Sequence, residues 1–259
     1  MINKVKRAYW NLAKLGRDFH RDIRSRQALR AGAVNAHFLH INKAAGSAVK
    51  EALFPYRLTP KYVLSLHVHA TTLRDVPVGD KFFFFLRDPV SRFVSGFDHR
   101  LNKGRPKYFT EWSAAEARVF EVFQSADSLA LGLSSDDAAR RELAEFGMRH
   151  IFHVRSSFYD WFESDAYFDS RRDDLLFIGF QETVERDFAY LAKVLGLSGE
   201  FRLPSDGVMS NRSMSFRKPH QMARRGLSEP AIDNLRHWYA ADFHFYQKCA
   251  ALAPRLWPE

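Results

Sequence analysis

The sequence predicts an α/β protein with three layers, in which helices cover both faces of a central parallel sheet. Two observations indicate this fold. Short apolar runs alternate along the chain with longer segments of helical periodicity, as in proteins built from strand–helix–strand units. Two of these runs, KFFFFL at residues 81–86 and LLFIGF at residues 175–180, are apolar almost throughout. Such runs are typical of parallel strands that are buried on both faces.

The first predicted unit begins with a strand at residues 36–41 (AHFLHI), which a short loop joins to a helix over residues 48–54. We expect the second strand at residues 62–66 and the third at residues 81–86. This order of strand, loop, helix and strand is the beginning of a parallel βαβ arrangement.

A helix is predicted directly after the third strand. Asp88 and Pro89 indicate its start, because aspartate is a frequent N-cap and proline a frequent first helical residue. The helix should run to about Leu101, before Gly104 and Pro106 end it.

The second half of the chain is predicted to be mostly helical around one more strand. Residues 111–149 have helical character, with a loop around residues 132–137. The strand at residues 175–180 is followed by a helix over residues 183–195, which Gly196 ends.

Both ends of the chain are also predicted to be helical. Residues 5–29 form a basic helix that either caps the domain or lies on an anionic surface, and residues 227–250 form a helix with Ser228 as its N-cap. We therefore divide the chain into a basic N-terminal helical extension, residues 1–35, and one α/β domain, residues 36–259.

The composition is that of a soluble globular protein and excludes disorder of the whole chain, since 46% of the 259 residues are hydrophobic and 27% are charged. One cysteine, Cys249, cannot form an intramolecular disulfide. No apolar stretch is long enough for a signal peptide or a membrane span, so we expect a cytoplasmic protein. The net charge of +9 favours a polyanionic partner, which includes nucleic acid, an acidic membrane, an anionic nucleotide and an acidic polysaccharide.

The loop after the first strand has the features of an anion site. Lys43 supplies a positive charge, Gly46 lets the chain turn tightly, and Ser47 adds a hydroxyl at the start of a helix, where unpaired N–H groups attract anions. The loop is not a Walker motif, in which the lysine follows the second glycine. An ordinary βα turn with an exposed lysine is the alternative.

A second anion site is predicted after the third strand. Arg87 lies at the carboxyl end of that strand, where open α/β sheets bind ligands. Ser95 follows on the next helix and shares a face with Arg92, Gly96 and His99 at helical spacing. Taken alone, Arg87 could be a structural arginine that pairs with Asp88. Two such motifs after two strands of one sheet instead indicate a ligand with two separated phosphates.

These residues resemble a known family. HFLHINKAAGSAV resembles the 5′-phosphosulfate loop of sulfotransferases that use 3′-phosphoadenosine 5′-phosphosulfate (PAPS), and FFFFLRDPVSRFVSGF resembles their 3′-phosphate motif. Three later stretches are also similar, IGFQETVERDFAYLAKVLGL, the NRS at residues 211–213 and the DFHFY at residues 242–246. The resemblance covers roughly residues 36–248 and is greatest to carbohydrate sulfotransferases of family 2, which include heparan 2-O-sulfotransferase, and to their soluble bacterial counterparts.

The resemblance implies a P-loop-like sulfotransferase domain over residues 36–259, with PAPS as donor. The residues implied to bind PAPS are Lys43, Ala44, Ala45, Gly46, Ser47, Ala48, Arg87, Ser95 and Ser213. Asn42 stands where the family has a proline, and Ala44 where it has a threonine, which removes one hydroxyl but keeps the backbone cradle. The 217–218 stretch is a further candidate for the 3′-phosphate.

Histidine is the expected base for the acceptor hydroxyl, because it titrates in the required range. His67-Val68-His69 follows the second strand and is similar to a His-x-His element of the 2-O-sulfotransferases. We expect His69 to be the base, His67 its partner, and Lys43 the residue that neutralises the leaving group. Surface histidines and a metal pair are the alternatives. No metal is required, since no cysteine or carboxylate completes a metal set near these histidines.

The positions of three further histidines in the predicted elements indicate their roles. We expect His37 and His40, on the first strand, to pack against the sheet, and His99 to line the site.

The acceptor is expected to be a hydroxyl of a carbohydrate or glycolipid. Basic residues after the third strand are expected to attract an anionic acceptor, namely Arg100, Lys103, Arg105 and Lys107. Neither nucleic acid nor a transmembrane segment is expected, and peripheral contact with a membrane is compatible with the basic extension. A P-loop kinase and a non-catalytic polyanion binder are the competing readings.

Overall fold

A computed structural model describes residues 22–106, 108–197, 203 and 226–257 of the chain. Its centre is a four-stranded parallel sheet with the order β2-β1-β3-β4. The strands are β1 (Val34–Leu39), β2 (Tyr62–Leu66), β3 (Lys81–Leu86) and β4 (Leu175–Phe180). The predicted three-layer α/β/α fold is therefore confirmed.

Three of the four strands have the bounds that the apolar runs predicted. The first differs: β1 begins at Val34 and ends at Leu39, two residues before the predicted ends. The predicted border between extension and domain, at residues 35/36, consequently falls inside β1. The shift also places His40 and Ile41 beyond the strand, in the loop that follows it.

One face of the sheet is covered by α2 (Gly46–Leu53) and α9 (Val184–Val194). Their apolar side chains pack with the strand residues that point to this face, including Phe38, Phe83 and Phe177. Because the side chains of a strand alternate between faces, their neighbours along the strands point to the opposite side.

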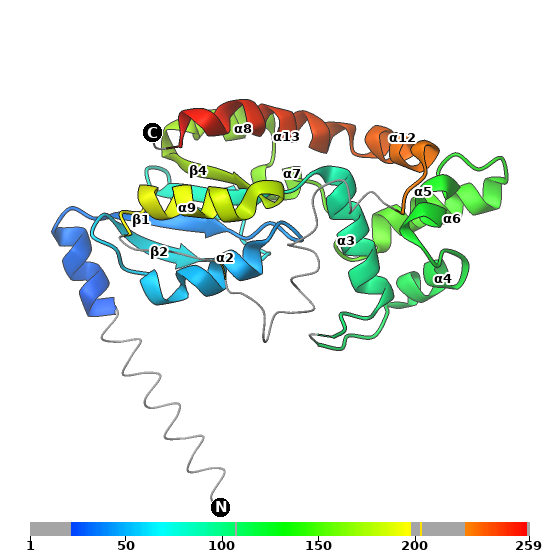
Figure 1. The fold of residues 1–259 in the computed structure, drawn as a ribbon, viewed down its shortest axis with the longest axis horizontal. Helices are drawn as coiled ribbons and strands as arrows, with labels where there is room; N and C mark the ends of the chain where they lie inside the picture. Colours follow the sequence, from blue (N-terminus) through cyan, green and yellow to red (C-terminus); the bar gives the residue numbers. More distant parts are fainter. Residues whose placement is uncertain (1–21, 107, 198–202, 204–225, 258–259) are drawn as a thin grey trace, which may run out of the picture.

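The opposite face is covered by α7 (Tyr159–Phe162), α8 (Asp165–Ser170) and α13 (Ala240–Leu252). Figure 1 shows α13 running along β4. Phe84 packs here against Phe162, with ring centroids 4.5 Å apart, and both belong to a cluster with Phe168 and Phe245. The sheet is thus enclosed by aromatic side chains on both faces.

A second apolar core joins helices at one end of the sheet (Figure 1). It is formed by α3 (Pro89–Leu101), α4 (Ala114–Val122), α5 (Ala126–Gly132), α6 (Ala138–His150) and α12 (Glu229–Trp238). The bounds of α3 agree with the prediction, and Asp88 caps it by accepting a hydrogen bond from the Ser91 N–H at 2.9 Å. This core fixes α3 relative to the sheet.

Two helical predictions need correction. Residues 111–149 contain a second break, at 123–125, where Ser125 and Ser128 form a capping box that starts α5. The predicted helix over residues 227–250 is two helices, because the chain turns at Tyr239, whose buried hydroxyl donates to the Val154 carbonyl at 2.7 Å.

Some elements were not predicted at all. Helices α7 and α8 span only four and six residues, too few to show a helical period. The described part of the predicted N-terminal helix, residues 22–30, is helical, and residues 1–21 lie outside the described part. Within the described residues no helix combines the length and apolar character that crossing a membrane requires.

Candidate active site

The loop between β1 and α2 has a backbone suited to binding an anion. Lys43 and Ala45 adopt left-handed conformations, with φ of 59° and 63°, and Ala44 between them does not. Alternation of this kind turns successive N–H groups toward a common point. The loop leads directly into α2, whose N-cap, Ala45, provides no side-chain cap. The first N–H groups of α2 therefore add to a cradle that the backbone itself forms.

Position 46 needs a glycine because the His40 ring leaves no room for a side chain, and not because the backbone is left-handed. A Cβ atom at this position would lie 2.0 Å from Cδ2 and 2.4 Å from Nε2 of His40. His40 is buried, and its ring lies over the first residue of α2 and against the tilted ring of His69, with centroids 3.8 Å apart. The sequence prediction that His40 simply packs against the sheet is incomplete, because it also forms one wall of the loop.

Arg87 lies against the same loop, at the end of β3. Its side chain is buried, and Nη1 donates to the Lys43 carbonyl at 3.4 Å. Its Nε has no hydrogen-bond partner among the described residues. Burial lowers the pKa of the Arg87 guanidinium, and the nearby carboxylate of Glu182 opposes this shift. A buried, incompletely bonded guanidinium directed at an anion-binding loop fits the predicted phosphate site.

Ser95, the predicted partner of Arg87, is half-buried on α3. Arg92 lies on α3 at the predicted helical spacing from Ser95, but it is buried, with an exposure of 1%. Its guanidinium donates to the Ser156 carbonyl at 2.6 Å, forms an ion pair with Asp242 of α13, and reaches Asn42 Oδ1 at 3.4 Å. Arg92 thus ties the start of the phosphate loop to α13.

His69 is oriented by its neighbours as a general base requires. Its Nδ1 lies 2.8 Å from the carbonyl oxygen of His40. A carbonyl can only accept, so Nδ1 carries the proton and, in the neutral ring, Nε2 keeps its lone pair. The His69 carbonyl in turn accepts from the Trp161 indole at 2.9 Å, which fixes the backbone.

His67 makes different contacts from His69. Its Nε2 lies 2.8 Å from Nδ1 of His37, and Nε2 of His37 lies 3.1 Å from Asp80 Oδ2. The Asp80 carboxylate accepts from His37 Nε2, and in the bond between His37 and His67 the nitrogen that carries the proton is the donor. Burial and the neighbouring His37 lower the pKa of His67. His37 therefore does more than pack against the sheet, since it links His67 to a carboxylate.

A further histidine, His153, lies beside His69 and was missed by the sequence analysis. Its ring centroid is 6.2 Å from that of His69 and 5.1 Å from that of His99. Its backbone has φ of 73°, and its side chain is buried. It stands alone in a loop, so no motif indicated it. The one signal was Gly96 inside α3, where a Cβ would lie 3.2 Å from Cβ of His153.

The basic residues predicted to attract the acceptor differ in their environment. Arg100 is buried and forms a two-point ion pair with Glu116, so its predicted role is wrong and it is structural. Lys103 pairs with Glu111 at 2.7 Å, and Arg105 lies over the Phe109 ring at 4.8 Å.

His99 joins this basic loop to the histidines of the site. Its Nε2 lies 2.9 Å from the hydroxyl of Tyr108. The predicted position of His99 along the site is compatible with this contact, because its ring also lies next to His153.

Several predicted residues cannot be placed. Lys107, Ser213 and the stretches 211–213 and 217–218 lie outside the described residues. In the described ranges no group of three or more histidine, cysteine or acidic side chains has the arrangement of a metal site.

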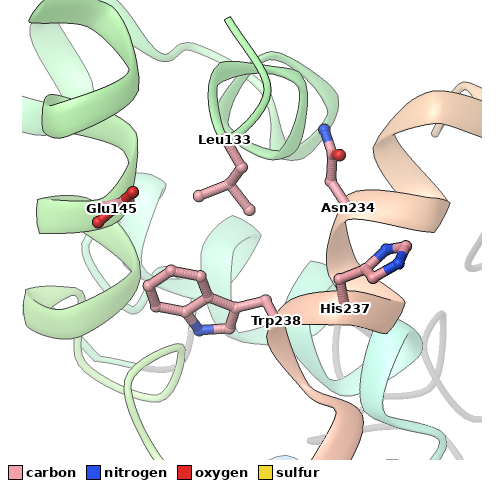
Figure 2. A pocket seen from close by; sticks show the side chains of 5 residues that line it. All are labelled: Leu133, Glu145, Asn234, His237 and Trp238. Carbon is pink, nitrogen blue, oxygen red and sulfur yellow. The ribbon is translucent and has the colours of Figure 1, made fainter. Parts of the chain in front are cut away.

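A surface pocket lies away from the predicted site residues, between α5, α6 and α12 (Figure 2). None of the predicted site residues lines it. Its lining residues are Leu133, Glu145, Asn234, His237 and Trp238.

The comparisons with known proteins give one match. Residues 27–248 match the model of a family described as the sulfotransferase family. Neither the curated proteins nor the solved structures include a match to the chain. The matched residues contain the phosphate loop, Arg87 and all the histidines described above.

Proposed function

The chain belongs to the sulfotransferase family, and we propose that it transfers a sulfuryl group from PAPS to a hydroxyl of a carbohydrate or glycoconjugate. Within the family we propose a carbohydrate-type enzyme, similar to heparan 2-O-sulfotransferase and its bacterial counterparts, that works in the cytoplasm without a metal. The resemblance of the two phosphate motifs, the net charge of +9 and the single cysteine support these finer assignments.

One observation carries the choice of donor: a buried arginine, incompletely bonded, faces a strained anion-binding loop. PAPS has phosphate groups at both ends of its nucleoside and supplies the sulfuryl group. The loop from Lys43 to Ala48 fits the 5′-phosphosulfate, because its alternating backbone conformation and the N-terminus of α2 favour an anion. Arg87 fits the 3′-phosphate, because its Nε lacks a partner among the described residues. Ser95 and Ser213 are assigned to the same phosphate by resemblance.

His69 and Lys43 have different roles in the proposed in-line displacement. A bond forms between the acceptor oxygen and sulfur while the bond between sulfur and the bridging oxygen breaks. His69 takes the hydroxyl proton on Nε2, since Nδ1 already donates to the His40 carbonyl. Lys43 neutralises the negative charge that remains on the leaving oxygen. The proton, the sulfuryl group and the electron pair of the broken bond are thereby all accounted for.

His67 positions this machinery rather than touching the acceptor. Its hydrogen bond to His37, together with the bond from His37 to Asp80, anchors the chain just before His69. Lys50 of α2 donates to the His67 carbonyl at 2.7 Å and ties the same segment to the helix of the phosphate loop. These contacts hold the phosphate loop and the proposed base in fixed positions relative to each other.

The region between α3 and α4 supports a sugar acceptor. Tyr108 and Phe109 are 45% and 50% exposed, and Arg105 and Lys103 lie beside the Phe109 ring. Exposed aromatic faces stack on sugar rings, and cations attract anionic substituents. Tyr108 also bonds to His99, so this surface reaches the histidines of the site.

Calorimetry with 3′-phosphoadenosine 5′-phosphate (PAP), the product of the donor, and with AMP tests the donor assignment. PAP is expected to bind far more tightly than AMP, because Arg87 recognises the 3′-phosphate. Arg87→Ala should weaken PAP binding strongly and AMP binding little. Equal affinities, or no binding, would contradict the proposal. Transfer from radiolabelled PAPS to a panel of sugars, glycolipids and small alcohols then identifies the acceptor.

A further inference from the structure

His153 combines three features that a structural histidine in a loop does not need. Its backbone lies in the left-handed region, with φ of 73°, a conformation that is uncommon for residues with a Cβ atom and less so for histidine than for most. Its side chain is buried, with a residue exposure of 6%. Its Nδ1 is also buried and has no hydrogen-bond partner among the described residues. Each feature costs free energy, and the protein keeps all three at one position.

The surroundings of His153 connect it with the proposed base and with the charge of the phosphate loop. Its ring lies next to His69, the proposed base, and Lys43 of the phosphate loop is its strongest charged neighbour. Gly96 of α3 makes room for it, since a side chain there would come within 3.2 Å of its Cβ and 3.3 Å of its backbone carbon. The absence of a side chain at Gly96 therefore leaves the space that His153 occupies.

We propose that His153 is a further residue of the active site, which donates a hydrogen bond from Nδ1 to an oxygen of the sulfuryl group between Lys43 and His69. This inference rests on the proposed function. A sulfonate oxygen can only accept, so the tautomer that binds carries its proton on Nδ1. The bond satisfies the buried nitrogen and explains why a strained backbone is retained.

The electrostatic surroundings suit a neutral donor. Burial and the positive charge of Lys43 lower the pKa of His153 to about 2, so the ring stays uncharged at neutral pH. A neutral N–H group stabilises charge on the sulfuryl oxygens without competing with His69 for the proton of the acceptor. His153 and His69 thus have separate tasks, although their rings are neighbours.

The inference predicts different results for two amide variants. In His153→Asn the amide nitrogen lies near the position of Nδ1, and asparagine tolerates the left-handed backbone. In His153→Gln the amide extends to the position of Nε2, so the donor is misplaced. His153→Gly relieves the strain and removes the donor. His150→Asn, which changes an exposed histidine of α6, is the matched control.

The binding experiment uses calorimetry of the whole protein without an acceptor. His153→Gly and His153→Gln are expected to bind PAPS about tenfold more weakly than the unchanged protein, as the loss of one charge-assisted hydrogen bond implies. Their affinity for PAP, which lacks the sulfuryl group, should change less than twofold. His153→Asn and His150→Asn should keep the affinity for both ligands. Equal losses for PAPS and PAP would overturn the proposal, because they would show a structural role.

A second measurement does not depend on variants. In protein labelled with ¹⁵N-histidine, the Nδ1 resonance of His153 is expected to shift on addition of PAPS and to stay in place on addition of PAP. No difference between the two ligands would refute the contact. If the unchanged protein binds neither ligand, the proposed donor itself is wrong, which separates that failure from the failure of this inference.

Discussion

Replacement of Gly46 by alanine tests how the phosphate loop and the proposed base are built together. The added Cβ would lie 2.0 Å from Cδ2 of His40, and ordinary contacts begin at 3.4 Å. The imidazole must therefore retreat by about 1.4 Å to restore an ordinary contact. His40 is buried and its ring lies against that of His69, so it has little room to move. Overpacking of this kind costs about 1–3 kcal/mol.

The expected result is a loss of both stability and activity. Gly46→Ala should lower the free energy of unfolding in urea by about 1–3 kcal/mol. Displacement of His40 also disturbs its carbonyl, which orients Nδ1 of His69. Transfer should therefore fall by more than PAP affinity does. Gly226→Ala is the matched control, because no atom of the described residues lies within 4 Å of its added Cβ.

A double-mutant cycle identifies the cause. If the His40 ring is the obstacle, His40→Ala should remove most of the cost of Gly46→Ala, and the coupling between the two changes should be about 1–2 kcal/mol. Additive effects would refute the reasoning, as would a Gly46→Ala protein as stable as the original. Either result would mean that the His40 ring does not require glycine at position 46.

Three further predictions concern the base, the buried ion pair and the pH dependence of folding. His69→Ala should keep PAP affinity in calorimetry and lose transfer of radiolabelled sulfate; turnover at the original rate would remove His69 from its role. Arg92→Met leaves the Asp242 carboxylate buried and unpaired, so urea unfolding should show a loss of about 3–5 kcal/mol, whereas Arg236→Met, in an exposed pair, should cost under about 1 kcal/mol. The pKa of His153 is about 2 in the folded protein and 6.5 in the unfolded chain. Because the folded value is depressed, its contribution to stability is complete above about pH 6.5 and is lost as the pH falls toward 2, at up to about 1.4 kcal/mol per pH unit. His153→Asn should flatten this slope in urea titrations at several pH values, and an unchanged slope would contradict the assignment.

The strands and the start of α3 could be predicted because their signals are local. Runs such as residues 81–86 and 175–180 are apolar on both faces, which few other elements require. Asp88 and Pro89 mark a helix start by themselves. Each of these signals lies within a few neighbouring residues, so one sequence suffices to find it.

Contacts between distant segments left no such signal. Arg92 looked like part of a polar helix face, because its spacing to Ser95 is helical. Its partner Asp242 lies 150 residues further along the chain, and only the packing of α13 reveals that the charge is buried. His153 was missed for the same reason, since α3 and the loop after α6 meet only in the folded protein.

The two histidines of the His-x-His element show how a correct local rule leads to an incomplete picture. Alternate residues share a face only while the chain stays extended, and β2 ends at Leu66, before either histidine. Beyond that point each ring is placed by a different partner, His67 by His37 and His69 by the His40 carbonyl.

Both partners come from β1 and the loop that follows it, so the pairing of β1 with β2 builds the proposed base. Phe38 pairs with Leu66 in this register, and the His67 N–H donates to the Phe38 carbonyl at 3.2 Å. A shift by one residue would turn His37 to the other face of the sheet and remove the link to Asp80. The position of the proposed base is therefore decided by strand register, which the buried phenylalanines on both faces of the sheet enforce.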